Sequence, residues 1–316
     1  MRTSDMDEED FDDVGEYGEY EEPPRRRRHS GRGLAWFLVL VILAAAVWFI
    51  RGQQPVRETE STGTRESGRC TILIAGTDKE GYRTDTIMLL SLDAKARKAS
   101  LLSIPRDTYV KDSPYSVPKI NSACGYAGGG KDGMEELMTQ VSKLLGFMPD
   151  GYALVDLDAF VQTVDLMGGV DFDVPMDMQY SDPSQGLDIN LKEGMQHLDG
   201  SQAIQLVRFR SGYAMADLTR TQVQRDFVKA AIKQWATPKN IVRLPALVGI
   251  IRDKMTTDLS SRNVMWLGRV LLGCRISDME TDTLPGSPQY IGRGAYYVAD
   301  PEKVQALMVQ SYSPYR

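Results

Sequence analysis

The chain has 316 residues, with 37 Lys and Arg against 43 Asp and Glu, and 42% of its residues are hydrophobic. This composition is that of a globular protein and excludes a collagen-like fibre, a coiled coil and a wholly disordered chain. The formal net charge of −6 gathers at the N-terminus, because residues 1–32 contain eleven acidic side chains and six arginines. The rest of the chain is nearly neutral, which argues against a nucleic-acid-binding protein, since phosphate neutralisation needs a basic excess.

Few residues suit zinc binding or histidine-dependent catalysis. The chain contains two histidines, His29 and His197, and three cysteines that form no CxxC pair, Cys70, Cys124 and Cys274. Structural zinc sites and Ser-His-Asp sites are therefore disfavoured. An odd number of cysteines cannot pair completely within one chain, and a Cys124–Cys274 bond and free buried thiols fit the sequence equally well. The inventory predicts a site made of carboxylates, arginines and hydroxyls.

Residues 34–50 are seventeen consecutive residues without a charge, LAWFLVLVILAAAVWFI. As a helix they extend ~26 Å, close to the thickness of a bilayer core of about 30 Å. A buried core helix is rarely this uniformly apolar, and a secretory signal peptide would be followed by a small-residue cleavage site, which is lacking here. The sequence therefore predicts a transmembrane helix over 33–51, after a disordered tail over 1–32.

Basic residues near this segment predict its orientation. Five arginines lie between residues 25 and 32, whereas Arg51 and Arg57 are the nearest basic residues after the segment. Cytoplasmic flanks carry the excess of Lys and Arg. We therefore expect a single-pass protein of the cell membrane with its N-terminus in the cytoplasm and residues 51–316 outside.

The pattern changes after the apolar segment. Residues 52–69 are polar and without hydrophobic periodicity, which predicts a flexible linker. From residue 70 onward, short apolar runs bounded by Gly, Asp and Pro predict buried strands over 71–76, 85–92 and 98–105. Apolar residues at helical spacing predict a helix over 133–146.

The rest of the chain continues to alternate strands and helices. Residues 152–175 predict a strand, a helix ended by Gly168 and Gly169, and another strand. Further helices are expected over 217–235, within 243–273 and near 301–310, with strands over 281–286 and 295–299. The alternation predicts one α/β/α-layered domain with a central mixed sheet over 70–316.

One glycine-rich stretch has the spacing of a phosphate-binding loop. The stretch GYAGGGKD over 125–132 satisfies G-x-x-x-x-G-K but ends in Asp132, where Ser or Thr would hold Mg²⁺. No clear strand precedes it, and a true loop of this kind needs one. A glycine-rich turn before the 133–146 helix is the better interpretation.

A second group of polar residues lies at predicted strand ends. Arg83 and Asp85 open the second strand, and Arg106 and Asp107 follow the third. Guanidinium groups bind phosphate oxygens through paired hydrogen bonds, and carboxylates bind hard divalent cations. Because α/β folds bind ligands at strand ends, these residues predict a phosphate or pyrophosphate site.

Two later segments carry the same kinds of side chain. Arg208 and Arg210 flank Phe209, and on an extended segment their side chains would share one face. Further along, Asp217, Arg220 and Gln224 lie at helical spacing on one face. These residues extend the predicted anion site.

The stretches that hold these residues resemble the LytR-CpsA-Psr family of membrane-anchored phosphotransferases. RTDT, IPRDT and VRFR, in this order, are the most specific motifs. The resemblance extends over nearly all of 70–316 and includes AGTD (75–78), RTDTIMLLSLD (83–93), SLLSIPRDTYV (100–110), KINSA (119–123), VDLDAFVQTVDLMGGVDFDVP (155–175), LDGSQAIQLVRFR (198–210) and DLTRTQVQRDF (217–227).

The resemblance implies roles for individual residues. A Mg²⁺ ion, or Mn²⁺ in its place, would be bound by Asp78 and Asp85. The pyrophosphate would be bound by Arg83, Arg106, Arg208, Arg210, Arg220 and Gln224. The catalytic set would comprise Asp85, Arg106, Asp107, Arg208 and Arg210. The general base is left open between Asp107 and Asp217.

The resemblance also implies the reaction. Such proteins transfer a glycopolymer, for example teichoic acid or capsule, from undecaprenyl pyrophosphate to peptidoglycan through a phosphodiester bond. A polyprenyl-pyrophosphate hydrolase and a non-catalytic envelope regulator that binds lipid pyrophosphate are the alternatives. One position departs from the family pattern D-x-x-R-x-x-R-Q, because Val223 takes the place of the second arginine. Arg225 lies about 200° around the helix from Val223, and we do not expect it to substitute.

Overall fold

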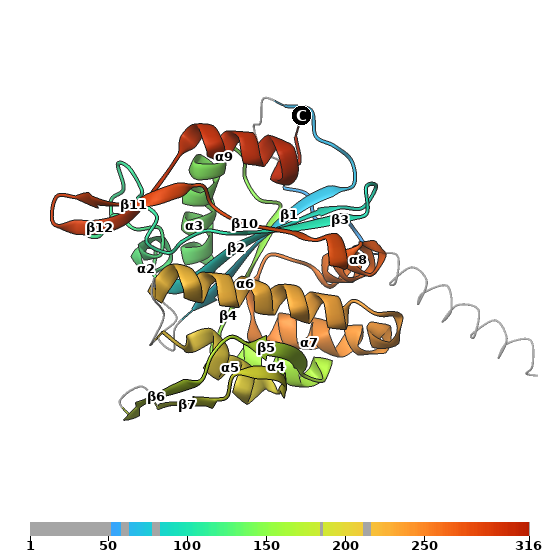
Figure 1. Ribbon diagram of the computed structural model, residues 1–316. Coiled ribbons are helices and arrows are strands. Elements are labelled where there is room, and N and C mark those ends of the chain that lie inside the picture. Colours follow the sequence, from blue (N-terminus) through green and yellow to red (C-terminus); the bar gives the residue numbers. More distant parts are fainter. Residues whose placement is uncertain (1–51, 58–62, 78–82, 184–185, 211–215, 316) are drawn as a thin grey trace, which may run out of the picture. The chain divides into compact units, whose positions relative to one another are not determined.

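The computed structural model describes residues 52–57, 63–77, 83–183, 186–210 and 216–315 (Figure 1). Its centre is a six-stranded sheet with the strand order β10-β3-β2-β1-β4-β9. These strands are β1 (Arg69–Thr77), β2 (Thr84–Asp93), β3 (Lys98–Ser103), β4 (Gly151–Val155), β9 (Thr256–Thr257) and β10 (Glu280–Thr283). β1 runs antiparallel to β2 and parallel to β4, and β3 runs antiparallel to β2 and parallel to β10. The sheet is therefore mixed, as the sequence predicts.

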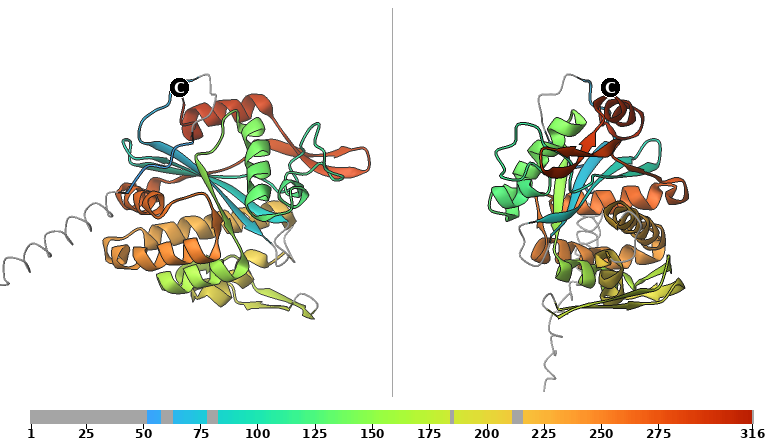
Figure 2. Two further views of the ribbon diagram at one scale, coloured as in Figure 1. Left: turned by 180° about the vertical axis from the view of Figure 1, so that it is seen from behind. Right: turned by 60° about the vertical axis from the view of Figure 1, so that its left-hand side comes forward.

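Helices cover both faces of this sheet (Figure 2). Consecutive strand residues point to opposite faces, and Leu89 and Leu90 are both buried. Leu89 packs in a cluster with side chains of α3 and α9, whereas Leu90 packs with side chains of α6 and α8. The helices are α2 (Ser122–Tyr126), α3 (Gly130–Leu145), α6 (Ala216–Trp235), α8 (Ser261–Gly273) and α9 (Pro301–Leu307). The expected α/β/α layering is confirmed.

The long helix α6 is apolar on two sides. Val228 and Ile232 pack toward the sheet, whereas Val223 and Phe227 belong to a second apolar cluster. That second cluster is built by α6 together with α4 (Leu157–Met167), β5 (Val170–Val174), β6 (Met178–Asp182), β7 (Leu187–Leu191), β8 (Gly194–Leu198) and α5 (Gly200–Arg208). The strands pair as two antiparallel ladders, β5 with β8 and β6 with β7. A helix with two apolar faces is held between two layers of the domain.

The ends of α4 and α5 follow from their sequences. The Asp156 carboxylate accepts a hydrogen bond from the Ala159 N–H at the start of α4, and Gly168 ends this helix in the left-handed conformation. The sequence analysis did not identify α5. Its signal was a capping box, in which the side chains of Asp199 and Gln202 each bond the other's backbone.

The C-terminal half differs from the predicted elements in detail. The helical region expected within 243–273 is two helices, α7 (Leu244–Lys254) and α8, separated by β9. The chain then continues through β10 into a hairpin of β11 (Gly286–Ile291) and β12 (Gly294–Ala299). Short helical turns complete the chain, η2 (Pro238–Arg243), η3 (Ile276–Asp278) and η4 (Met308–Tyr312).

The glycine-rich stretch over 125–132 connects two helices, α2 and α3. Gly128, Gly129 and Gly130 have positive φ values of 88°, 75° and 56°, which favour glycine. A phosphate-binding loop of this type follows a strand, and here a helix precedes it. The glycine-rich turn is confirmed.

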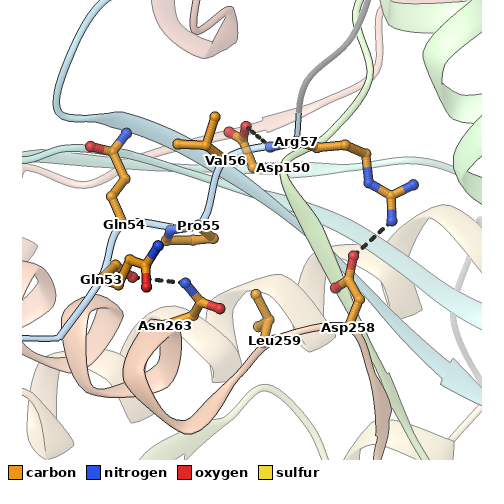
Figure 3. A pocket seen from close by; sticks show the side chains of 9 residues that line it. All are labelled: Gln53, Gln54, Pro55, Val56, Arg57, Asp150, Asp258, Leu259 and Asn263. Atoms are coloured by element: carbon orange, nitrogen blue, oxygen red, sulfur yellow. Dashed lines mark hydrogen bonds and ion pairs between the residues drawn. The ribbon is translucent and has the colours of Figure 1, made fainter. Parts of the chain in front are cut away.

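Part of the linker predicted over 52–69 lies against the domain (Figure 3). The Asn263 Nδ2 atom donates to the Gln53 carbonyl at 2.8 Å, and an Arg57 Nη2 atom donates to Asp258 at 2.7 Å. These partners are distant in the sequence, so the polar composition of the segment did not reveal them.

The tail predicted over 1–32 and the transmembrane helix predicted over 33–51 lie outside the described residues, and both stay predictions. Within the part of the chain that the structure describes, no helix is long and apolar enough to cross a membrane. Cys70, Cys124 and Cys274 all lie in the described part of the chain and form no disulfide, and the first two are buried. The alternative of a Cys124–Cys274 disulfide is thereby corrected.

Candidate functional site

The register of two antiparallel strands brings Asp85 and Arg106 together. Met88 of β2 pairs with Ser103 of β3. Asp85 precedes Met88 by three residues and Arg106 follows Ser103 by three, so both lie beyond the same end of this ladder. These strands are buried on both faces, and a shift of one residue would exchange side chains between the two apolar clusters that flank the sheet.

Two arginines bind the Asp85 carboxylate. Arg106 Nη1 donates to Oδ1 at 2.7 Å, and Arg210 Nη2 donates to Oδ2 at 2.8 Å. The side chains of Asp85 and Arg106 are 28% and 23% exposed, whereas that of Arg210 is 54% exposed. The carboxylate thus holds two guanidinium groups next to each other at a partly open surface, where they would otherwise repel.

The charges around Asp85 lower its pKa. Burial raises the pKa of this carboxyl, but the hydrogen bond and charge of Arg106 and the charges of Arg210 and Arg220 more than offset burial. Arg220, on the first turns of α6, is 2% exposed. Asp85 is therefore ionised at neutral pH, and several cations surround one anion.

Arg208 lies beside this group but not on an extended segment. It is the last residue of α5, and the extended backbone begins at Phe209. The expectation that Arg208 and Arg210 alternate along an extended segment is thus wrong, because the apolar positions of α5 favour a helix there. Burial and the nearby charge of Arg210 lower the pKa of Arg208, while the charge of Asp182 raises it. Burial is the larger cause, and the charge of Arg210 adds to it, so the two arginines lie within electrostatic range of each other.

Gln224 is buried and holds elements together. Its Oε1 accepts a hydrogen bond from Thr86 Oγ1 at 3.1 Å, and its Nε2 donates to the Val207 carbonyl at 2.8 Å. The amide therefore links α6 to β2 and to α5, one residue before Arg208. The two bonds join the elements that carry Asp85, Arg208 and Arg220, and Gln224 is 7% exposed.

The departure from the family pattern is visible on α6. Val223 is 7% exposed and packs in the second apolar cluster. Arg225 does not take the place of the missing arginine, because its side chain extends to β10, where its Nη1 donates to Thr283 Oγ1 at 2.6 Å. The structure therefore agrees with leaving Arg225 out of the site.

Other predicted residues are placed differently. Asp107 forms an ion pair with Lys119 at 2.8 Å, and Arg83 is exposed just before β2. Asp78 and the side chain of Asp217 lie outside the described residues. The general base thus stays open between Asp107 and Asp217.

The sequence analysis missed three participants in this network, Thr86, Lys119 and Asp182. Thr86 and Lys119 belong to stretches with family resemblance, RTDT and KINSA, but nothing in their local pattern indicated a partner. Asp182 ends β6, an element that the sequence analysis did not predict. Each is bound or influenced by a residue far away in the chain, and only the folded chain reveals such pairs.

Asp85 is the described carboxylate of this group that could contribute to a divalent cation shared with phosphate oxygens. Its oxygens accept bonds from Arg106 and Arg210, and a carboxylate offers about four acceptor positions. Among the described residues, no group of three or more His, Cys, Asp and Glu side chains could hold a metal. A magnesium ion in a substrate site commonly takes one or two carboxylates and completes its shell with phosphate and water.

A pocket on another part of the domain is lined by residues of the linker segment and its neighbours (Figure 3). It contains none of the predicted site residues, and its lining residues are Gln53, Gln54, Pro55, Val56, Arg57, Asp150, Asp258, Leu259 and Asn263. The arginine group around Asp85 is the stronger candidate, because it brings several of the predicted site residues together.

Known proteins are similar to this chain in sequence and in fold. The model of the LytR_cpsA_psr family matches residues 50–311. The chain is 30% identical over 224 residues to the polyisoprenyl-teichoic acid–peptidoglycan teichoic acid transferase TagV of Bacillus subtilis, covering 70% of this chain and 56% of that protein. It therefore spans little more than half the length of that relative. The transferase of the same description from Oceanobacillus iheyensis, TagU, is 30% identical over 264 residues, which are 81% of this chain and 80% of TagU.

A solved structure agrees with these similarities. The crystal structure of B. subtilis TagV matches with a TM-score of 0.67 at 27% identity, covering 79% of this chain and 99% of that chain. A family model thus matches more than half of this chain, and a solved structure matches the fold of 79% of it. The protein belongs to the LytR_cpsA_psr family.

Proposed function

We propose that this protein is a membrane-anchored phosphotransferase that joins a glycopolymer to peptidoglycan. Its donor is a glycopolymer on undecaprenyl pyrophosphate, and its product contains a phosphodiester bond. The observation that carries the proposal is the gathering of Arg106, Arg210 and Arg220 around one carboxylate, Asp85, with Arg208 beside Arg210. Guanidinium groups held together at a partly open surface suit the oxygens of a pyrophosphate.

The relatives support the choice of substrates. TagV and TagU carry names that describe transfer of teichoic acid from a polyisoprenyl carrier to peptidoglycan. Transfer of a glycopolymer by this chain follows from that similarity together with the arginine group. The predicted membrane helix over 33–51 and the excess of arginines before it support an anchored, extracytoplasmic catalytic domain.

The site residues can stabilise the charge that moves during transfer. An acceptor hydroxyl attacks the phosphorus that carries the glycopolymer, the bond from that phosphorus to the bridging oxygen breaks, and polyprenyl phosphate leaves. Arg106 and Arg210, already held by Asp85, need little rearrangement to bind the phosphate oxygens, and preorganised charge is the main source of catalysis in phosphoryl transfer. A Mg²⁺ ion on Asp85 would supply further neutralisation of charge.

The test is transfer activity with a lipid-linked pyrophosphate donor and a peptidoglycan acceptor. We expect Arg106→Ala to lower turnover about 10²-fold, the scale for loss of one charge-stabilising donor. Arg252→Ala is the control, because Arg252 forms an exposed pair with Asp253. Full activity of Arg106→Ala would contradict the proposal. Release of polyprenyl phosphate without dependence on acceptor would favour hydrolysis, and tight donor binding without turnover would favour a regulator.

A further inference from the structure

The hairpin β11–β12 projects from the domain beyond α2 (Figure 1, and the back view of Figure 2). Every residue of β11 is exposed. A two-stranded hairpin has little stability of its own in water, so its base must be secured by the domain. At the base, Tyr297 is 9% exposed and its hydroxyl donates to the Leu284 carbonyl at 2.6 Å.

Backbone hydrogen bonds connect this hairpin to the segment after Arg106. The Tyr297 N–H donates to the Asp107 carbonyl at 2.9 Å, and the Tyr109 N–H donates to the Tyr297 carbonyl at 2.8 Å. Arg106, the residue before Asp107, binds Asp85 in the candidate site. The base of the hairpin is therefore hydrogen-bonded to the backbone that directly follows Arg106.

The register of the hairpin separates its side chains into two faces. Gln289 pairs with Tyr296, whereas Tyr290 pairs with Ala295. Directly paired residues share a face and consecutive residues alternate, so Tyr296 and Gln289 lie on one face and Tyr290 lies on the other. Ile291, two residues after Gln289, joins the first face and is 38% exposed.

Residues of the 107–119 segment extend the Tyr296 face. The rings of Tyr109 and Tyr296 pack edge to face with centroids 5.3 Å apart. Lys119 Nζ lies 5.6 Å from the centre of the Tyr296 ring and also pairs with Asp107 at 2.8 Å. The Lys119 charge is thus balanced, and the surface combines two phenol rings, an amide and one neutralised ion pair.

This chemistry suits a sugar better than a phosphate or a bilayer. The C–H bonds of a pyranose pack on the electron-rich faces of aromatic rings, and its hydroxyl and amide groups bond side-chain amides. Lys119, the cation beside the Tyr296 ring, is paired with Asp107, and this pairing favours a neutral ligand there over an anionic polymer or a charged lipid headgroup.

We propose that the surface formed by Tyr109, Tyr296, Gln289 and Lys119 binds the glycan strand of the peptidoglycan acceptor. The inference rests on the proposed function and names the subsite that presents the acceptor hydroxyl. Asp107, which pairs with Lys119, directly follows Arg106, so this surface lies next to the arginine group along the chain. The edge-to-face rings and the hydrogen-bonded base keep the surface in place before the glycan arrives.

The test measures binding of purified peptidoglycan strands, free of other wall polymers, to the full-length protein in detergent. Tyr296→Ala is expected to weaken glycan binding about tenfold, the scale of one aromatic contact. Tyr296→Phe keeps the ring and should retain most of the affinity. Tyr290→Ala is the matched control, because Tyr290 is on the same hairpin, is 84% exposed and faces the other way.

Steady-state transfer assays separate this inference from the proposed function. Tyr296→Ala should raise the KM for the glycan acceptor and leave the KM for the lipid-linked donor unchanged. Unchanged glycan binding in Tyr296→Ala, an equal loss in Tyr290→Ala, or a change in donor KM alone would overturn the glycan site. Absence of transfer by the wild-type protein would instead refute the proposed function, while glycan binding would still test the surface.

Discussion

Asp150, at the start of β4, is a buried carboxylate that secures the segment before β1 to the domain. Its side chain is 0% exposed and its Oδ1 pairs with Arg65 Nη2 at 2.7 Å. Oδ2 accepts from the Thr71 N–H at 2.9 Å, and the Arg57 N–H lies 3.3 Å from Oδ1 (Figure 3). One carboxylate thus satisfies donors from two parts of the predicted linker and from β1.

Replacing Asp150 by Ala should destabilise the domain strongly. The substitution leaves the Arg65 guanidinium and the Thr71 N–H without their acceptor, and breaking a buried pair costs about 3–5 kcal/mol. Arg65 is 21% exposed, so water offsets part of the loss and the lower end, about 3 kcal/mol, is expected. For a domain of this size, that loss lowers Tm by roughly 6–12 °C.

The assay is thermal unfolding of the full-length protein in detergent, followed by intrinsic fluorescence. The matched control is Asp253→Ala, which removes an Arg–Asp pair of the same length, 2.7 Å, whose side chains are 73% and 55% exposed. The control should leave Tm unchanged, because water replaces an exposed pair. A Tm for Asp150→Ala within a degree of the wild type would refute the reasoning from burial.

Three further predictions concern other parts of the domain. The pKa of Asp85 lies below the usual value near 3.9, so its charge stabilises the folded chain above about pH 4 and this contribution is lost as pH falls through the folded pKa. Urea titrations should therefore show that the difference in unfolding free energy between wild type and Asp85→Asn shrinks below about pH 4. A difference that stays constant with pH would contradict this prediction. Gly169 and Gly146 have φ values of 76° and 83°, but an added Cβ meets His197 Nε2 at 2.4 Å only at Gly169, since nothing lies within 4 Å at Gly146. Gly169→Ala should lower Tm more than Gly146→Ala. In both variants the left-handed backbone costs an alanine about 1–2 kcal/mol, and only the Cβ at position 169 also clashes with a neighbour. Burial raises the pKa of Cys274 to about 11, so a disulfide reagent at pH 8 should modify it roughly 10²-fold more slowly than a free thiol. All three thiols should react after unfolding without reductant, whereas a single reactive thiol would reveal a disulfide.

Long apolar runs and helix-ending glycines predicted much of the fold. The strands over 71–76 and 85–92 lie within β1 and β2, and the helix expected over 217–235 is α6. These patterns are local, since a buried strand or helix must be apolar where it packs. The short strands β6 and β7 were missed, although the alternating burial of β7 over Leu187–Leu191 agrees with a period of two.

Within the candidate site, too, some features follow from local sequence patterns and others do not. The motifs RTDT and IPRDT placed Asp85 and Arg106 at strand ends, and the ladder confirms that they meet. Four residues, VRFR, are too few to distinguish a helical from an extended period, and the structure places Arg208 on α5. Gln224 shows a further limit, because a buried amide with two internal partners cannot be told from a ligand-binding one by spacing.

The sequence by itself determined which segments are apolar enough to form the central sheet and which polar residues follow its strands. Tertiary structure decided which of these residues share a site. Asp85 is bound by Arg106, 21 residues away, and by Arg210, 125 residues away. Local patterns record how each segment is buried, whereas such pairings depend on strand register and on helix packing between segments that are distant in the chain.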